Sequence, residues 1–554
     1  AIRLSLVGSE MCIRDSELKH HMNSISAEEL KTRIVSGKEF ALIDVRTKGE
    51  FAKAHLLFAV SIPLDKLELV FHQLVPRFET PIILCDDGSG MAERAADRLI
   101  QFGYNRIDIL QGGIHAWKEA GYEIFSGINV PSKAFGEFVE QRYSTPHLSA
   151  NELKAKIDAG EKLVILDSRP MQEFTKMNIP GAYCCPGAEL VYRVSDASID
   201  SETMVVVNCA GRTRSIIGCQ SLINAGVPNP VVALKDGTMG WHLAGFELEK
   251  GQSRYAPKVS ETGLQRSKEM CRDVIKRFGV QQIKVSELRT FQKQSEERSL
   301  FLLDVRSPEE FESGHLAGSK SAPGGQLVQA TDEYVGVRNS RLVLIDDTGV
   351  RAIMTASWLI QMGWEEVYVL EGGLENNDLE TGPEQKKVLG IEEVNPENLS
   401  AEQLNQIIQN ENPLILDLAD SLEFREGHLP GAKRASRSGM AKYLENQNRH
   451  SHVILSSSDG ALASLTAEEV QRNLNREVLV LEGGVEAWKK AGYLLEQGDD
   501  PDAGELSDDV WYKPYQRADA VEDSMKAYLT WEVGLVEQIE RDGTTNFKSF
   551  DPSV

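Results

Sequence analysis

The sequence predicts an α/β protein made of four tandem domains, each a doubly wound parallel sheet with helices on both faces, followed by a C-terminal helical tail. Two observations predict this fold. One set of motifs recurs four times in the same order along the chain, which indicates repeated structural units. Within each copy, short apolar strands alternate with helical stretches, the pattern of a parallel sheet covered on both faces. A chain of 554 residues is also too long for one hydrophobic core.

Each copy begins with a helix and an apolar strand. A Ser followed by acidic residues marks each helix start, because the Ser side chain caps the first turn and acidic side chains suit the helix dipole. The helix starts lie at Ser26, Ser149, Ser286 and Ser400. The next strand reads LIDVR at 42–46, ILDSR at 165–169, LLDVR at 302–306 and ILDLA at 415–419, each followed by Glu-Phe. Each copy closes with a strand and a Gly-containing turn that leads into another helix.

These landmarks predict the domain boundaries. We expect domains at 23–127, 146–253, 282–380 and 396–499, a helical linker at 254–281 and a helical tail at 505–554. Residues 1–22 share nothing with the repeat and are expected to be a non-native or disordered leader. Apolar residues of the tail recur at roughly helical spacing, which predicts an amphipathic helix packed on the four domains or at a contact in a homodimer.

Composition excludes several classes of partner. The formal net charge of −24 at pH 7 disfavours nucleic acid or an anionic membrane surface. No stretch is long and apolar enough to span a membrane. The seven cysteines follow no regular framework, which is typical of reduced thiols in a cytoplasmic protein. Those at Cys184, Cys185, Cys219 and Cys271 lack metal-ligand spacing and are interpreted as packing residues, so neither a metal nor another cofactor is expected.

The loop that begins at Cys209 is the strongest candidate for chemistry. A β-branched strand at 205–207 leads into it, the loop carries Arg212 and Arg214, and the residues from Ser215 have the composition of a helix start. Loop N–H groups and the positive end of the helix would converge on the sulfur, so we expect them to stabilise a thiolate and a bound anion. The alternative is a buried cysteine that ends a core strand.

The other copies carry different side chains at the position of Cys209. Alignment of the strand ends places Cys85, Asp346 and Ser456 there. Because neither Asp346 nor Ser456 can carry a sulfane sulfur, copies three and four are predicted to be non-catalytic. Cys85 keeps the thiol, but the adjoining Asp86 and Asp87 would raise its pKa and repel an anionic donor, which makes it the weaker candidate.

Together these motifs resemble the rhodanese-like sulfurtransferase family. The shared pieces are the Asp-x-Arg after the second strand, the Glu-Phe pair, a Pro-Gly-Ala element at 180–182 and 430–432, the Cys-headed loop and the closing Gly turn. Four copies with a tail are similar to bacterial tetra-domain rhodanese-related proteins. The resemblance implies a doubly wound α/β fold and a cysteine that forms a persulfide. Copy four departs from the pattern, with Ala419 in place of the Arg.

The resemblance and the Cys209 loop predict a sulfurtransferase. The Cys209 thiolate would attack the outer sulfur of thiosulfate or a related persulfide donor, and cyanide or a thiol would then remove that sulfur by a ping-pong route. Arg212 and Arg214 would bind the anionic donor. The rest of the donor site would be formed by Ala210, Gly211, Thr213 and Ser215. Asp167 and Arg169 lie at the adjacent strand end, and the favoured interpretation is an ion pair that braces the loop.

Two other classes of function remain open. A non-enzymatic sulfur carrier or interaction scaffold would explain why two copies lack the nucleophile. A Cys-dependent phosphatase is a remote alternative, because such an enzyme needs an Arg at the sixth position after the Cys, whereas Arg214 is the fifth residue after Cys209. Steady-state turnover of a small donor would separate an enzyme from a carrier.

Overall fold

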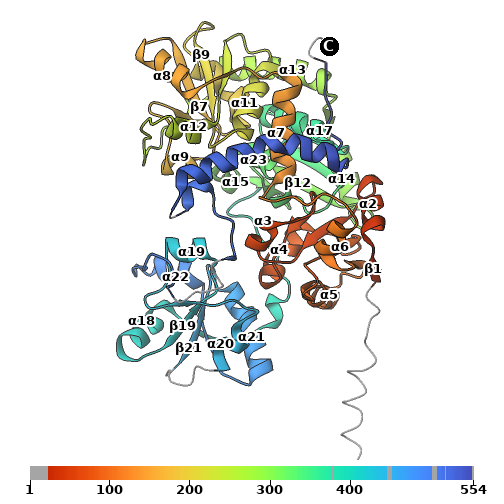
Figure 1. The fold of residues 1–554 in the computed structure, drawn as a ribbon, viewed down its shortest axis with the longest axis vertical. Helices are drawn as coiled ribbons and strands as arrows, with labels where there is room; N and C mark the ends of the chain where they lie inside the picture. Colours follow the sequence, from red (N-terminus) through yellow and green to blue (C-terminus); the bar gives the residue numbers. More distant parts are fainter. Residues whose placement is uncertain (1–22, 376–378, 446–451, 502–507, 518, 552–554) are drawn as a thin grey trace, which may run out of the picture.

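The computed structural model describes residues 23–375, 379–445, 452–501, 508–517 and 519–551. The predicted leader, 1–22, lies outside the described residues. Four five-stranded sheets form the protein, and we name the units around them domains 1 to 4. Domain 2 lies at the top left of Figure 1, and domain 4 lies at the bottom.

The four sheets share one topology. In domain 1 the strand order is β1-β5-β4-β2-β3, and the same order recurs in the other three domains with every neighbouring pair of described strands parallel. The second and fourth strands therefore lie side by side at the centre of each sheet, where the order of the strands reverses. Loops after the carboxyl ends of these two strands face each other, which is where ligands bind in open α/β sheets.

Domain 1 has helices on both faces of its sheet, as predicted. Its elements are β1 (Asn23–Ile25), α2 (Ala27–Val35), β2 (Ala41–Asp44), α3 (Lys48–Lys53), β3 (Val60–Ser61), the 3-10 helix η1 (Leu64–Lys66), α4 (Leu67–Leu74), β4 (Ile82–Cys85), α5 (Met91–Gln101), β5 (Ile107–Leu110) and α6 (Gly113–Glu119). Ser26 caps α2 as the sequence predicts: its hydroxyl accepts from the Glu29 N–H, and the Glu29 carboxylate accepts from the Ser26 N–H.

Domain 2 repeats this order of elements. It contains β6 (His147–Leu148), α8 (Ala150–Asp158), β7 (Leu163–Asp167), α9 (Met171–Lys176), β8 (Tyr183–Cys184), α10 (Glu189–Ala197), β9 (Met204–Asn208), α11 (Thr213–Asn224), β10 (Val231–Leu234) and α12 (Gly237–Leu243). Helix α11 begins two residues before the predicted start at Ser215.

Domain 3 differs from the others at its end. It contains β11 (Gln281–Ile283), α14 (Val285–Lys293), β12 (Leu300–Asp304), α15 (Pro308–Ser313), β13 (His315–Leu316), β14 (Lys320–Ser321), α16 (Gly324–Gln329), η2 (Thr331–Glu333), β15 (Arg341–Ile345), α17 (Val350–Gln361), β16 (Val367–Leu370) and β17 (Leu379–Glu380). The described residues after Gly373 form no closing helix, contrary to the prediction for this copy. Strand β17 instead pairs with β13 in a small antiparallel sheet.

Domain 4 and the tail complete the chain. Their elements are η3 (Ile391–Glu393), β18 (Glu397–Leu399), α18 (Ala401–Asn410), β19 (Leu414–Asp417), α19 (Ser421–Glu426), β20 (Lys433–Arg434), α20 (Met440–Glu445), β21 (Val453–Ser456), α21 (Ala461–Leu474), β22 (Leu479–Leu481), α22 (Gly484–Lys490), η5 (Pro514–Gln516) and α23 (Val521–Asp542). Helix α23 buries Leu529, Leu535 and Ile539 on one face, as an amphipathic helix packed on the domains should.

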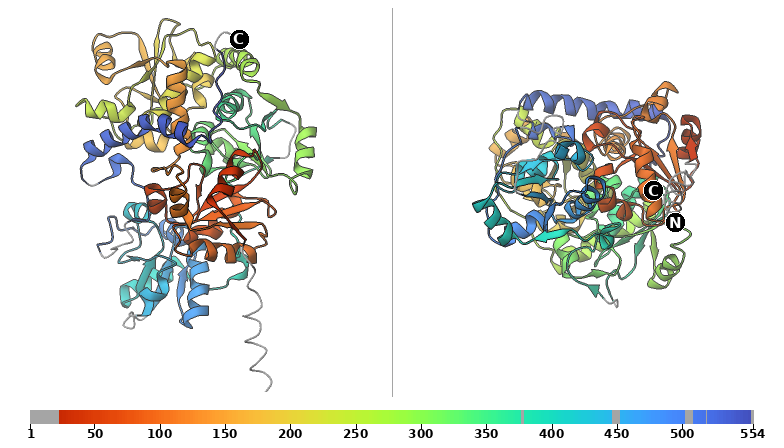
Figure 2. Two further views of the ribbon diagram at one scale, coloured as in Figure 1. Left: turned by 45° about the vertical axis from the view of Figure 1, so that its right-hand side comes forward. Right: turned by 90° about the horizontal axis from the view of Figure 1, so that it is seen from below.

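Three helices between and after the domains hold the assembly together. Helix α7 (Val130–Tyr143) occupies a segment with no predicted structure and contacts α11 and α23. Helix α13 (Glu261–Phe278) lies within the predicted helical linker and packs on α10 and α17. Figure 2 shows α23 along one side of the molecule. One continuous apolar core runs through domains 1, 2 and 3, whereas domain 4 has a separate core. No helix in the described ranges is both long and apolar enough to cross a membrane.

Candidate functional site

The Cys209 loop lies at the centre of the domain 2 sheet. Strand β9 ends at Asn208 and α11 begins at Thr213, so residues 209–212 form the whole loop. The backbone N–H and the hydroxyl of Ser168, just after β7, both donate to the Asn208 carbonyl at 2.8 Å. The Asn208 side-chain amide donates to Asp167 at 2.8 Å. The ends of β7 and β9 are therefore fixed to each other directly beneath the loop.

Helix α12 holds the loop from the other side. The Thr238 N–H and hydroxyl donate to the Cys209 carbonyl at 2.8 and 2.9 Å. Gly237 has φ +56°, and a Cβ on this residue would lie 2.4 Å from the same carbonyl oxygen. Only glycine permits this approach. The closing Gly turn of the repeat thus fixes the backbone of the nucleophile loop.

Asp167 and Arg169 form a fully buried ion pair. Arg169 donates to the two carboxylate oxygens of Asp167 at 2.9 and 2.7 Å, and to the Met177 carbonyl at 2.8 Å. The equivalent pair in domain 1 joins Asp44 and Arg46 with the same geometry. Asp167 also accepts from the Asn208 amide, so the pair joins the ends of β7 and β9 beneath the loop, which is consistent with the predicted brace. One Arg169 nitrogen, Nη1, has no hydrogen-bond partner among the described residues.

Cys209 is held in a nearly closed environment. Its side chain is 2% exposed, and its sulfur lies 3.5 Å from the Ser215 hydroxyl oxygen. Burial raises the pKa of the Cys209 thiol, while the charge of Arg214 and hydrogen bonding with Ser215 act to lower it. The net direction is upward, which differs from the expected stabilisation of a thiolate. The reason is burial, which disfavours the charged form of any thiol.

Arg214 lies beside Cys209 and is fixed by two neighbours. It donates to both carboxylate oxygens of Glu173, at 3.1 and 2.8 Å. It also donates to the side-chain oxygen of Gln326, from domain 3, at 3.1 Å. Burial acts to raise the pKa of Glu173, but Arg214 and Lys513 hold it well below its usual range. The Glu173 carboxylate is therefore charged and sets the direction of the guanidinium.

Arg212 makes different contacts from those expected. It donates to both carboxylate oxygens of Glu137, at 2.7 and 2.8 Å, to Asp236 at 3.0 Å, and to Glu140. Three carboxylates thus surround one guanidinium that is 7% exposed. These contacts anchor the loop to α7, because α7 carries two of the three carboxylates. Arg212 also lines the pocket described below, and a part in donor binding stays a prediction.

A pocket of about 430 Å³ opens beside this loop. It is lined by all of the predicted loop residues 209–214, whereas Ser215, Asp167 and Arg169 lie behind its wall. Every domain and the tail contribute to it. Side chains from outside domain 2 include Lys48, Gln326, Asp420, Lys513, Tyr515, Tyr528 and Glu532. Gln326 belongs to a Gly-Gly-Gln turn for which the sequence interpretation weighed a place at the cleft mouth but favoured a turn. The sequence interpretation missed the other residues, because they become neighbours of Cys209 only through domain docking. The one local signal was the aromatic residues clustered around Lys513.

The Cys85 loop lacks these features. Cys85 is completely buried, and burial together with the charge of Asp44 raises the pKa of its thiol well above the usual value. The Asp86 carboxylate accepts from the N–H groups of Gly88 and Ala92, so it stabilises the loop from within. No Arg stands at the position equivalent to Arg214.

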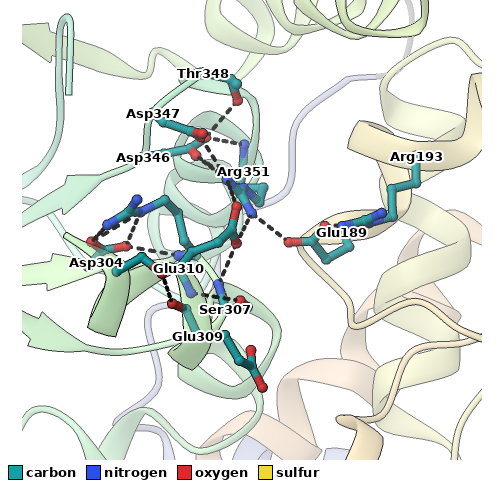
Figure 3. Close-up of polar contacts among 12 residues, drawn as sticks. Glu189, Arg193, Asp304, Ser307, Glu309, Glu310, Asp346, Asp347, Thr348 and Arg351 are labelled. Carbon is teal, nitrogen blue, oxygen red and sulfur yellow. Dashed lines mark hydrogen bonds and ion pairs between the residues drawn. The ribbon is translucent and has the colours of Figure 1, made fainter. Parts of the chain in front are cut away.

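Ion pairs occupy the domain 3 loop at the position equivalent to the Cys209 site, as Figure 3 shows. Arg351 is the fifth residue after Asp346, the position that Arg214 holds in domain 2. Its guanidinium contacts Asp346 at 3.0 Å, Glu310 at 2.7 Å and Glu189, from domain 2, at 2.8 Å. Asp346 thus fills the position of the nucleophile with a carboxylate already paired to the arginine.

Domains 2 and 3 contact each other reciprocally around these arginines. Glu189 reaches from domain 2 to Arg351, and Gln326 reaches from domain 3 to Arg214. Glu189 begins α10, and Gln326 lies in the first turn of α16, so the two side chains come from equivalent helices. Domain 3 therefore supplies a direct contact to the Cys209 site although its own loop lacks a nucleophile.

Domain 4 has lost both parts of the site. Ser456 replaces the cysteine and is completely buried. Because Ala419 replaces the usual Arg, one carboxylate oxygen of Asp417 has no hydrogen-bond partner among the described residues. Burial raises the pKa of Asp417 to about 6.

Comparisons with known proteins agree with this architecture. The model of the Rhodanese-like domain matches residues 26–120, 149–244, 287–377 and 400–491. The crystal structure of thiosulfate sulfurtransferase from Pseudomonas aeruginosa is 43% identical, with a TM-score of 0.90, and the match covers 96% of this chain and 100% of that one.

Two curated relatives match parts of the chain. A sulfurtransferase from Allochromatium vinosum is 30% identical over 19% of this chain and 94% of its own length. A thiosulfate sulfurtransferase from Azotobacter vinelandii is 26% identical over 27% of this chain and 60% of its own length. These matches support sulfur transfer. With four matching segments over most of its length, the chain belongs to the family of proteins with Rhodanese-like domains.

Proposed function

We propose that the chain is a rhodanese-type sulfurtransferase in which Cys209 accepts a sulfane sulfur from thiosulfate or a related persulfide donor and passes it to a thiol or cyanide. One observation carries this proposal: the Cys209 loop places a thiol in a pocket together with Arg214, whereas Cys85 is completely buried and has Gly90 at the position equivalent to Arg214. The names of the relatives favour the same chemistry.

The first half-reaction loads the cysteine. The Cys209 thiolate attacks the outer sulfur of the donor, the bond to the sulfonate sulfur breaks, and its electron pair leaves on sulfite. Cys209 is then a persulfide. Arg214 supplies the permanent positive charge next to the reacting sulfurs, and Glu173 and Gln326 fix its orientation.

The second half-reaction removes the outer sulfur from the Cys209 persulfide. A nucleophilic acceptor attacks the outer sulfur of the persulfide, and the electron pair of the S–S bond returns to Cys209. The donor product leaves before the acceptor reacts, so the kinetics should be ping-pong.

Turnover of thiosulfate with cyanide tests the proposal in two single-cysteine variants. Cys209→Ser should abolish turnover, and Cys85→Ser should keep it within about twofold. Turnover by Cys209→Ser equal to that of the wild type would contradict the assignment. A wild-type protein that takes up one sulfur stoichiometrically without turnover would favour the carrier instead.

A further inference from the structure

Glu532, on the C-terminal helix α23, lies against the Cys209 loop and lines the same pocket. Its side chain is 2% exposed. One carboxylate oxygen accepts from the Tyr528 hydroxyl at 2.8 Å and from the Thr213 hydroxyl at 3.4 Å. The other oxygen has no hydrogen-bond partner among the described residues. A Cβ placed on Gly211 would lie 3.3 Å from that second oxygen, which therefore lies against the loop itself.

A buried carboxylate oxygen without a partner needs an explanation, because leaving it unsatisfied costs free energy. Cys209 and Glu532 line the same pocket. Its volume of about 430 Å³ lies within the range of pockets that hold small organic ligands. There is thus room for an acceptor with its sulfur near Cys209 and its proton near Glu532.

The surroundings of Glu532 set it apart from the other carboxylates of the site. Glu173 is held by Arg214, and Glu137 by Arg212, each through two hydrogen bonds. Glu532 has no such partner. The cation that affects the pKa of Glu532 most is Lys133. Its ammonium group lies 5.0 to 5.2 Å from the ring centres of Trp511, Tyr528 and Trp531 and donates to the Ile128 carbonyl at 2.7 Å.

Burial raises the pKa of Glu532 to about 7, although the charge of Lys133 and the Tyr528 hydrogen bond act to lower it. Burial lowers the pKa of Lys133 to about 8. The titratable and charged groups around Glu532 are Lys133 and Glu137 on α7, Cys209, Arg212 and Arg214 on the loop and the first turn of α11, and Tyr528 on α23 itself. A carboxylate that titrates near neutral pH is suited to proton exchange with a thiol.

We propose that Glu532 is the general base that takes the proton of a thiol acceptor in the second half-reaction, which makes protonated organic thiols the acceptor class of this site. The inference rests on the proposed sulfur transfer through Cys209. The acceptor S–H bond breaks, and its proton moves to the free oxygen of Glu532. The resulting thiolate attacks the outer sulfur of the Cys209 persulfide, the S–S bond breaks, and its electron pair returns to Cys209. Glu532 then returns the proton to the terminal sulfur of the product persulfide. One S–S bond forms as another breaks, so no external oxidant is required.

Rapid-mixing kinetics on the full chain can isolate this step. The protein is first loaded with thiosulfate, freed of excess donor, and mixed either with cysteine or with sulfite. Cysteine must lose a proton before it attacks, whereas sulfite is already a dianion in mildly alkaline buffer. Sulfite therefore attacks the same persulfide without the proposed proton transfer.

Glu532→Gln keeps the shape and the hydrogen bond from Tyr528 but cannot accept a proton. We expect it to slow sulfur transfer to cysteine by at least about tenfold and to leave transfer to sulfite within about twofold. In the wild type the rate with cysteine should rise with pH through about 7. In Glu532→Gln this rise should move toward the pKa of the free thiol, about 8.5. Glu540→Gln, at an exposed position on the same helix, is the matched control and should match the wild type.

Several results would overturn the inference. Glu532→Gln could transfer sulfur to cysteine at the wild-type rate, or with an unchanged pH profile. Equal losses with cysteine and sulfite would assign Glu532 a structural role. If the wild-type protein formed no persulfide with thiosulfate, the proposed function itself would fail, and the acceptor step with it. If the wild type formed the persulfide but Glu532→Gln transferred sulfur to cysteine as fast as the wild type, only the role of Glu532 as general base would be refuted.

Discussion

Replacing Gln326 with Ala removes the contact that domain 3 makes to the arginine of the Cys209 site. Gln326 accepts from Arg214 at 3.1 Å, while Glu173 keeps its two bonds to the same guanidinium. A hydrogen bond to a charged group contributes about 1.5–3 kcal/mol. Because Glu173 still holds Arg214, we expect a loss near the lower limit, which corresponds to roughly tenfold in rate.

Steady-state kinetics with thiosulfate give the assay. Gln326→Ala should lower kcat/KM for the donor about tenfold without changing the melting temperature appreciably. Gln292→Ala, at an exposed position of the same domain, is the matched control. If Gln326→Ala kept wild-type kcat/KM within about twofold, the contact from domain 3 would have no part in positioning Arg214.

Substitutions at three further positions test other parts of the account. Arg214→Ala should lower kcat/KM for thiosulfate by an amount equivalent to roughly 1.5–3 kcal/mol of transition-state stabilisation. Arg214→Lys should recover part of this loss, because Lys keeps the charge but not the two-pronged geometry. Equal kinetics of both variants and the wild type would place the side chain outside the donor site. Gly237→Ala should abolish persulfide formation, since its Cβ would lie 2.4 Å from the Cys209 carbonyl oxygen. Hydrogen exchange should show that domain 2 is still folded in this variant. Normal formation of the persulfide would show that the loop tolerates displacement. The pKa of Asp417 is raised by burial to about 6, so its contribution to folding is present below its unfolded pKa and is lost as pH rises through 6. Hydrogen exchange should therefore show domain 4 less protected at pH 8 than at pH 5, by about 1.4 kcal/mol, because pH 5 already lies between the unfolded and folded pKa values. Asp417→Asn should remove that difference, and a variant with the same pH dependence would exclude Asp417 as its cause.

The fold was accessible from the sequence because its determinants are local and repeated. The Asp-x-Arg motif, the Ser caps and the closing Gly turns each occupy a few consecutive residues and make contacts within their own domain. The predicted cap at Ser286 is wrong, because α14 begins at Val285 and Lys284 precedes it. The Cys209 loop was accessible for the same reason. Its thiol, its arginines and the start of α11 are contiguous.

The remainder of the site depends on docking between distant segments. Glu137 lies in a segment without a predicted helix, so the sequence did not reveal that it would engage Arg212. Glu532 is one of the buried residues of α23, and it lines the pocket. The apolar pattern of this helix indicated only that the helix packs on the domains. The pKa of Cys209 was misjudged because it depends on burial, which follows from the assembled domains.

Locating the transferred sulfur by peptide mapping tests the central claim most directly. The full chain is incubated with thiosulfate, its free thiols are blocked, and the peptides that contain each cysteine are analysed by mass spectrometry. The account predicts one additional sulfur on Cys209, which lines the pocket, and none on Cys85, Cys184, Cys185, Cys219 or Cys271. Sulfur found mainly on Cys85 would contradict the account. So would a Cys209→Ser variant that takes up sulfur on another cysteine at the wild-type rate.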